Sequence, residues 1–234
     1  MTSLEGPRGT PVQSEHDPDA TLLPETPPGY ADPVEFRYPL VGLVALVAAL
    51  TVFSLALFGW LLYVAQGPDA LAAAVAIEET ADSVTFTTDL GVLALALLFG
   101  VGAVTALHEF VHGLAYRLLG YEVSYGVLVG MGAFYAAAFH QFQRRDHNLL
   151  VGAAPLVVID AILVAALFVP NPTVAFVAFV GLLFNTTGAA GDLYLVATLL
   201  RMPGDVLLYD SDARHSYVFY RGGGEDENRQ TRRS

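Results

Sequence analysis

The residues most able to do chemistry in this sequence are two histidines and a glutamate. His108 and His112 are four residues apart, and Glu109 directly follows the first of them. On an α-helix, residues four apart lie on one face, so both imidazoles can bind the same metal ion. In this pattern the glutamate is not a ligand, because it takes a proton from the activated water and passes it to the leaving amine. The pattern predicts a zinc ion, which lowers the pKa of its water to about 7.

Such a site needs a third protein ligand and an open position for water. The chain has no cysteine, so the ligand must be a histidine, an aspartate or a glutamate. Ala115 and Leu118 stand where the extended metzincin pattern would have glycine and histidine. Glu122 is the nearest glutamate downstream, but it follows the predicted helix and lies in a loop.

Asp192 is the better candidate, because its predicted depth in the membrane matches that of His108. His108 precedes Arg117 by nine residues, and Asp192 precedes Arg201 by nine. Each arginine ends an apolar segment that runs in the same direction, which places both side chains roughly 13 Å from one membrane boundary. The alternative for Asp192 is a polar contact between helices or a pairing with arginine.

Three further polar residues lie within or beside apolar segments. Asn185 is seven residues before Asp192 on the same helix face, where it could hydrogen-bond substrate or an oxyanion. A helix–helix hydrogen bond is the alternative for Asn185. Asp160 interrupts an apolar segment, and its role stays open. His140 could bind substrate, but a surface histidine is the simpler interpretation.

The elements that would position these residues are apolar segments of about 20 residues, the length that spans a bilayer. Four such segments cover residues 40–65, 90–120, 149–169 and 173–200. They predict an all-α membrane protein of about four transmembrane helices. Because ionisable groups at membrane depth are costly and are functional by default, residues 108–112 are more than chance polar positions.

The stretch 121–143, after the second predicted span, differs from the other segments. It is rich in β-branched and aromatic residues and is broken at Gly130 and Gly132. It is too short and too broken for a fifth span, so a small β-hairpin or a re-entrant segment is predicted here. A short interfacial helix is the alternative.

Charge sets the orientation and excludes one class of partner. The formal net charge is −12, and all 11 basic residues are arginines. So acidic a chain argues against nucleic-acid binding, and together with the lack of lysine it predicts a halophilic protein. The loop 67–89 has five acids and no basic residue, whereas arginines occur in both tails and in 116–148. The positive-inside rule therefore predicts a multi-pass protein of the cell membrane with both termini cytoplasmic.

This distribution divides the chain into three parts. Residues 1–37 are polar, acidic and proline-rich, and we expect a disordered N-terminal tail. Residues 38–203 would form the transmembrane metallopeptidase domain, and residues 204–234 a cytoplasmic C-terminal tail.

Four stretches together resemble the membrane zincin peptidase family, which is distantly similar to the site-2 proteases. They are HEFVHGLAYRLLG, YEVSYGVLVGMGAFYAAAF, APLVVIDAIL and NTTGAAGDLYLVATLLRMP, and they cover roughly residues 85–210. Site-2 proteases carry Asn-x-x-Pro followed by Leu-Asp-Gly; here Asn185 and Asp192 fit in part, with no proline and with Leu193 after the aspartate. The resemblance implies a zinc endopeptidase that cuts within the membrane, and strands in 121–143 that pair with an extended substrate.

The sequence thus predicts a membrane-embedded zinc metallopeptidase with Glu109 as general base and with His108, His112 and Asp192 as metal ligands. Its partners would be the lipid bilayer and a membrane protein or peptide substrate. The alternatives are a non-catalytic scaffold that keeps a metal site, or a transporter whose path would include Asp160, Asn185 and Asp192.

Overall fold

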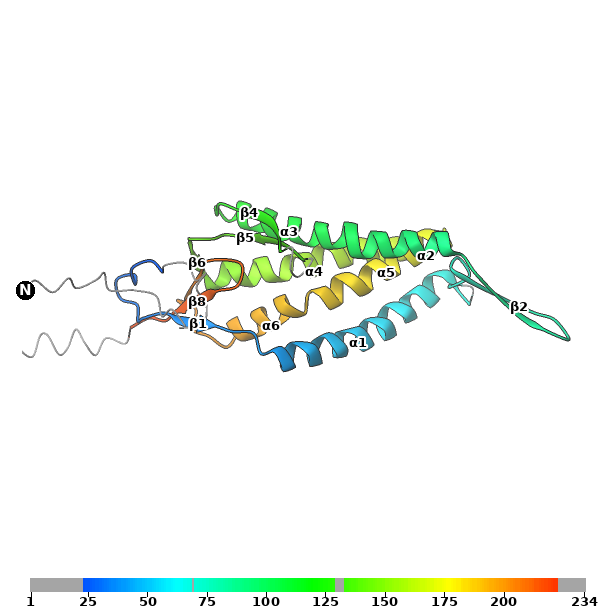
Figure 1. The fold of residues 1–234 in the computed structure, drawn as a ribbon, viewed down its shortest axis with the longest axis horizontal. Helices are drawn as coiled ribbons and strands as arrows, with labels where there is room; N and C mark the ends of the chain where they lie inside the picture. The colour runs from blue at the N-terminus through cyan, green and yellow to red at the C-terminus, as the bar shows by residue number, and fades with distance from the viewer. Residues whose placement is uncertain (1–22, 69, 129–132, 223–234) are drawn as a thin grey trace, which may run out of the picture.

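The computed structural model describes residues 23–68, 70–128 and 133–222. The described part is mostly helical, with three small sheets (Figure 1). Its helices are α1 (Leu40–Gln66), α2 (Leu90–Leu97), the π-helical η1 (Leu98–Val104), α3 (Thr105–Leu118), α4 (Arg145–Leu167), α5 (Pro172–Gly188) and α6 (Ala190–Leu199). Its strands are β1 (Val34–Phe36), β2 (Val75–Glu79), β3 (Val84–Thr88), β4 (Ser124–Leu128), β5 (Ala133–Ala137), β6 (Phe142–Arg144), β7 (Leu207–Asp210) and β8 (Ser216–Phe219).

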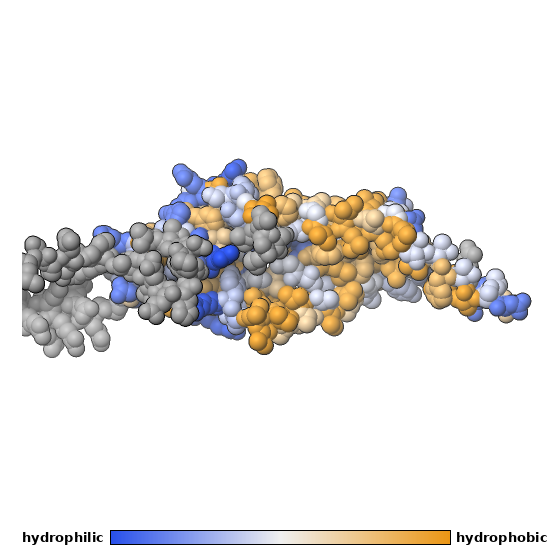
Figure 2. Space-filling model, viewed as in Figure 1, coloured by the Kyte–Doolittle hydropathy of each residue, from blue (hydrophilic) through white to orange (hydrophobic). Residues whose placement is uncertain are grey.

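Three helical stretches are long and apolar enough to cross a membrane: α1, the continuous run 90–118 and α4. The predicted fourth span is a pair of helices, α5 and α6, bent by 44° at Ala189, and it adds a fourth crossing if the pair is one span. Figure 2 shows apolar surface over the helical part of the molecule and hydrophilic residues at both ends. Apolar side chains on the outer face of α1, such as Val41 and Trp60, are exposed, as expected of a surface in contact with lipid.

The ends of these helices follow from local chemistry. The Asp89 side chain accepts a hydrogen bond from the Val92 N–H at 3.0 Å and caps α2 at its predicted start. Asn171 caps α5 in the same way, and Pro172 occupies its first turn, where a missing N–H breaks no helical bond. A short connection, residues 168–171, therefore separates α4 from α5.

The core lies where α5 packs against α1, α4 and η1. Phe58 and Leu62 from α1 meet Leu163 from α4 and Leu182 from α5 there. The close approach of η1 to α5 depends on Gly181, since a Cβ at that position would lie 3.1 Å from both the Phe99 ring and the Leu163 side chain. This packing fixes α5, and with it α6, relative to the run that contains α3.

Residues from both predicted tails, together with β6 just before α4, form a four-stranded antiparallel sheet in the order β1-β8-β7-β6 that covers one end of the helices (Figure 1). We call this sheet the cap. The predicted all-α fold with a small β-hairpin did not include this sheet, in which residues 34–36 of the expected N-terminal tail pair with 216–218. Short runs of apolar residues in β7 and β8 bury Tyr209 and Phe219 and hold the cap together.

Two further strand pairs lie outside the cap. β2 and β3 pair antiparallel and project from the opposite end of the helices (Figure 1). β4 and β5 also pair antiparallel, so strands and not an interfacial helix occupy much of 121–143. Gly130 and Gly132 lie outside the described residues. β5 packs against α3, and its second edge is left without a partner strand among the described residues.

Candidate metal centre

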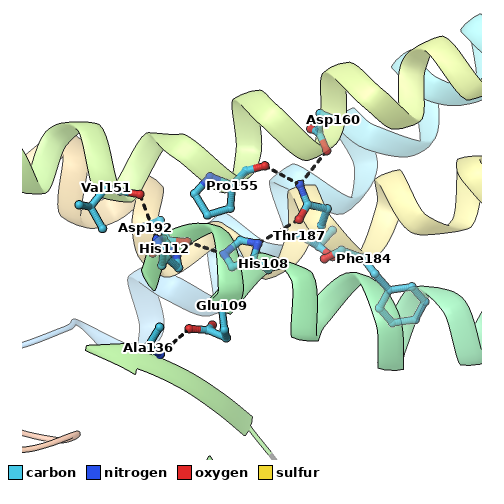
Figure 3. A network of polar contacts seen from close by, with 11 residues as sticks. His108, Glu109, His112, Ala136, Val151, Pro155, Asp160, Phe184, Thr187 and Asp192 are labelled. Carbon is cyan, nitrogen blue, oxygen red and sulfur yellow. Dashed lines mark hydrogen bonds and ion pairs between the residues drawn. The ribbon is translucent and has the colours of Figure 1, made fainter. Parts of the chain in front are cut away.

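The helix α3 brings His108, Glu109 and His112 together, as the spacing predicts. Both histidines are buried, with 7% exposure each, and Glu109 is half-buried. The ligand atoms of the three side chains lie within 4.8 Å of one another. Figure 3 shows both imidazoles pointing from α3 toward the first turn of α6, where Asp192 lies.

Asp192 contacts both histidines, in each case at the ring nitrogen Nε2. Its Oδ2 lies 3.0 Å from Nε2 of His108, and its Oδ1 lies 3.3 Å from Nε2 of His112. Ligand atoms around a tetrahedral zinc ion, each about 2.0–2.1 Å from the metal, are about 3.3 Å apart. Both separations between Asp192 and the histidines are therefore close to those expected for ligands of a shared zinc ion.

The contact made by Nδ1 of His112, the ring nitrogen that faces away from Asp192, shows which of the two ring nitrogens carries a proton. Nδ1 lies 2.9 Å from the carbonyl oxygen of Val151 on α4, and a carbonyl can only accept. Nδ1 is therefore the donor, and in a neutral ring Nε2 keeps its lone pair. Pro155 explains why this carbonyl is free: a proline in a helix has no N–H to donate to the carbonyl four residues earlier.

His108 is oriented in the same way by Asn185. The Asn185 side-chain N–H groups donate to the carbonyl oxygen of Pro155 at 3.3 Å and to Oδ1 of Asp160 at 2.9 Å. Its amide oxygen is then the atom that lies 2.9 Å from Nδ1 of His108, so Nδ1 is again the donor. Asp160 is held in turn by the Thr186 hydroxyl, which donates to Oδ2 at 2.8 Å.

Both Nε2 lone pairs thus face the Asp192 carboxylate. The carboxylate repels both lone pairs unless a positive charge lies between the carboxylate and the two nitrogens. A metal ion supplies that charge, and two imidazoles with one carboxylate are ligands that zinc accepts. Hydrogen bonds from the outer ring nitrogens are the usual support of such ligands. The residues present therefore fit a zinc ion.

Glu109 faces β5. The N–H of Ala136 donates to its Oε2 at 2.9 Å, and Oε1 has no hydrogen-bond partner among the described residues. Two cavities include both Glu109 and Asp192: one of about 170 Å³ beside His108 and one of about 150 Å³ beside His112. The centre is therefore open on two sides, with a free carboxylate oxygen next to the histidines.

The structure also places the other residues that the sequence singles out. Asn185 is buried and both its amide hydrogens are taken, so it makes the helix–helix contact and has no donor left for an oxyanion. Asp160 belongs to the support of His108. His140 lies after β5 with a φ of 59°, and its N–H bonds to the carbonyl of Asp210 in the cap. Glu122 is outside the centre, with its backbone bonded to Gln141.

The backbone groups of Val151 and Ala136 were not predicted from the sequence. Any residue type supplies a carbonyl or an amide, so no side chain marks them. Pro155 was the one available signal, because a proline inside an apolar helix exposes a carbonyl one turn earlier.

No curated protein and no solved structure matches this chain. One family model matches residues 101–207, a segment that contains α3, α6 and all the residues of the centre described above. The predicted family resemblance is thereby confirmed for this segment, whereas the similarity to site-2 proteases stays a prediction. Residues 101–207 thus match the model of the family described as "Putative zincin peptidase".

Proposed function

We propose that the protein is a membrane-embedded zinc metallopeptidase in which His108, His112 and Asp192 hold the metal and Glu109 is the general base. The observation that carries the proposal is the convergence of both Nε2 atoms on one carboxylate, 3.0 and 3.3 Å away, with Glu109 beside them. The family match and the three apolar helices support it.

The reaction would be hydrolysis of a peptide bond. Zinc, when bound, supplies Lewis acidity that polarises a carbonyl and makes water more acidic. Glu109 takes one proton from the attacking water through its free Oε1, so that the hydroxyl can add to the carbonyl carbon. As the carbon–nitrogen bond breaks, Glu109 passes that proton to the leaving amine, and a carboxylic acid and an amine result, which then exchange a proton with water.

The surrounding protein suits an extended peptide. The second edge of β5 faces Glu109, as the hydrogen bond from Ala136 to its carboxylate indicates. An extended segment can add to such an edge as a further strand, which would carry its backbone past the carboxylate. A structural zinc site would more often be closed by a fourth protein ligand, whereas two cavities reach this centre.

Glu109→Gln separates this function from a metal site without catalysis. Because glutamine cannot take the proton, cleavage of a peptide library, read by mass spectrometry, should fall at least about a hundredfold while zinc stays bound. His112→Ala is the comparison variant and should lose both zinc and cleavage. Undiminished turnover in zinc-loaded Glu109→Gln would show that Glu109 is not the base.

A further inference from the structure

Cavities on both sides of Glu109 extend the candidate centre in two directions. On one side an apolar groove of about 320 Å³ lies between α3 and the β4–β5 pair, lined by Ala106, Phe110, Arg117, Tyr125, Phe134 and also by Glu109. On the other side is the 150 Å³ cavity that contains His112 and Asp192.

That second cavity continues into the cap. It shares the lining residues Tyr116, Ala136, Asn148 and Leu195 with a cavity of about 220 Å³, which we call the cap cavity. Tyr38 lines the cap cavity. One path therefore leads from the groove, past Glu109, to the cap.

The chemistry of the cap cavity differs from that of the groove. The rings of Phe36, Tyr38 and Phe139 line it together with the carboxyl groups of Asp210 and Asp212, and none of its described lining residues is basic. Burial raises the pKa of Asp210. Partial burial also acts on Asp212, but hydrogen bonds from the Arg214 and His215 N–H groups and the His215 ring outweigh it and lower the pKa. Asp212 therefore stays negatively charged beside the aromatic cavity, where its carboxylate already pairs with the His215 ring at 2.8 Å.

Aromatic faces beside a carboxylate recognise a cation, and in a peptide that cation is arginine or lysine. Basic residues flank membrane-spanning segments on their cytoplasmic side. β5 runs beside this path, from Phe134 at the groove to Ala136 at Glu109, and Phe139 follows at the cap cavity. Three residues of extended chain span about 10 Å, so the basic residue would lie within about four positions of the cut bond.

We propose that the substrate is the cytoplasmic end of a membrane-spanning segment, with apolar side chains in the groove and an arginine or lysine in the cap cavity. The proposal rests on the function proposed above. It assigns the groove and the cap cavity as the two sides of one substrate site.

Binding tests this proposal without requiring cleavage. Zinc-loaded, full-length Glu109→Gln protein in phosphatidylcholine vesicles is titrated with three labelled synthetic peptides. All three carry the same Leu/Ala segment of about 20 residues, followed by a short tail that contains arginine, glutamine or glutamate. At pH 8, where histidines are mostly neutral, the arginine peptide should bind about tenfold more tightly than the glutamate peptide, a preference of about 1.4 kcal/mol.

Asp212→Asn should reduce that preference to about threefold or less, because asparagine keeps the Oδ1 acceptor but loses the charge. Asp205→Asn is the matched control: Asp205 pairs with Arg221 at 3.6 Å in the cap and does not line the cavity, so the preference should persist. Equal binding of the three peptides, or tightest binding of the glutamate peptide, would overturn the proposal.

Cleavage by the wild-type protein separates the two proposals. If the arginine peptide binds selectively and nothing is cut, the substrate site stands and the peptidase function fails. If all three peptides are cut equally well, the peptidase function stands and the substrate site is wrong.

Discussion

At the scale of single residues, the metal centre depends on which ring nitrogen of each histidine is free. Val151 and Asn185 accept hydrogen bonds from the two Nδ1 atoms, and this leaves both Nε2 atoms directed at Asp192. The side chains themselves could be predicted from the sequence, because HExxH spacing and matched depth involve only residue types and helix rise. The hydrogen bonds from His112 to the Val151 carbonyl and from the Ala136 N–H to Glu109 could not, since both partners are backbone groups.

Asp160 gives a residue-scale prediction. It holds the Asn185 amide in the orientation that lets the amide oxygen accept from His108. Asp160 accepts at both carboxylate oxygens, from Asn185 and from Thr186, and asparagine keeps only one of these acceptors. Zinc affinity in Asp160→Asn should therefore fall about tenfold, while saturating zinc still fills the site. Competition with a chelator measures the affinity.

Thr186→Val is the comparison for Asp160→Asn, because it removes one donor to Asp160 and leaves the Asn185 contact intact. Zinc affinity should fall less in Thr186→Val than in Asp160→Asn. Unchanged zinc affinity in Asp160→Asn would show that the contact between Asp160 and Asn185 does not support the metal ligand.

At the scale of elements, the positions of the spans could be predicted but their irregularities could not. Runs of apolar residues and capping side chains mark where α2 and α5 begin. The π-helical η1 and the bend at Ala189 leave no such mark, because the same apolar composition suits straight and distorted helices. η1 packs against α5, which is distant from it in sequence.

Pro155 in α4 gives an element-scale prediction with two opposite effects. Pro155→Ala restores an N–H that can donate to the Val151 carbonyl, which His112 now uses. The metal-free protein should become more stable, since proline disfavours a helix interior. Zinc affinity should fall, by tenfold or less. Thermal unfolding and chelator competition measure the two effects.

Pro172→Ala is the control for Pro155→Ala, since Pro172 lies in the first turn of α5 and its missing N–H breaks no helical bond. It should leave zinc affinity unchanged. An equal or higher affinity in Pro155→Ala would mean that the free carbonyl does not matter to His112.

At the scale of the whole molecule, the cap could not be predicted from the sequence. Its strands have only three or four residues each, and β1 and β8 come from opposite ends of the chain. Short polar-flanked segments of this kind resemble tails until their partners are known. The cap matters to function because its cavity continues from the metal centre.

Orientation in the membrane gives the whole-molecule prediction. The arginine bias predicts that the cap is cytoplasmic and that the β2–β3 pair lies outside. Because the chain has no cysteine, Ser83→Cys creates a single thiol in the turn between β2 and β3. An impermeant maleimide should label it in intact cells, whereas Ser3→Cys and Ser234→Cys should react only after permeabilisation.

Labelling of the terminal cysteines in intact cells would show that the protein has the opposite orientation, with both termini outside. It would also place the cap cavity outside the cell and remove the reason for expecting a basic substrate residue there.

The zinc content of the purified protein tests the central claim most directly. After loading and removal of free metal in detergent, the wild-type protein should hold about one zinc ion per chain. Asp192→Ala should hold almost none, because two imidazoles alone make a weak site, and Asp192→Asn should lose most of its activity, because an amide is a weaker ligand. The cap variant Asp205→Asn should hold as much zinc as the wild type. Full occupancy in Asp192→Ala, or a wild-type protein that holds no zinc, would contradict the account.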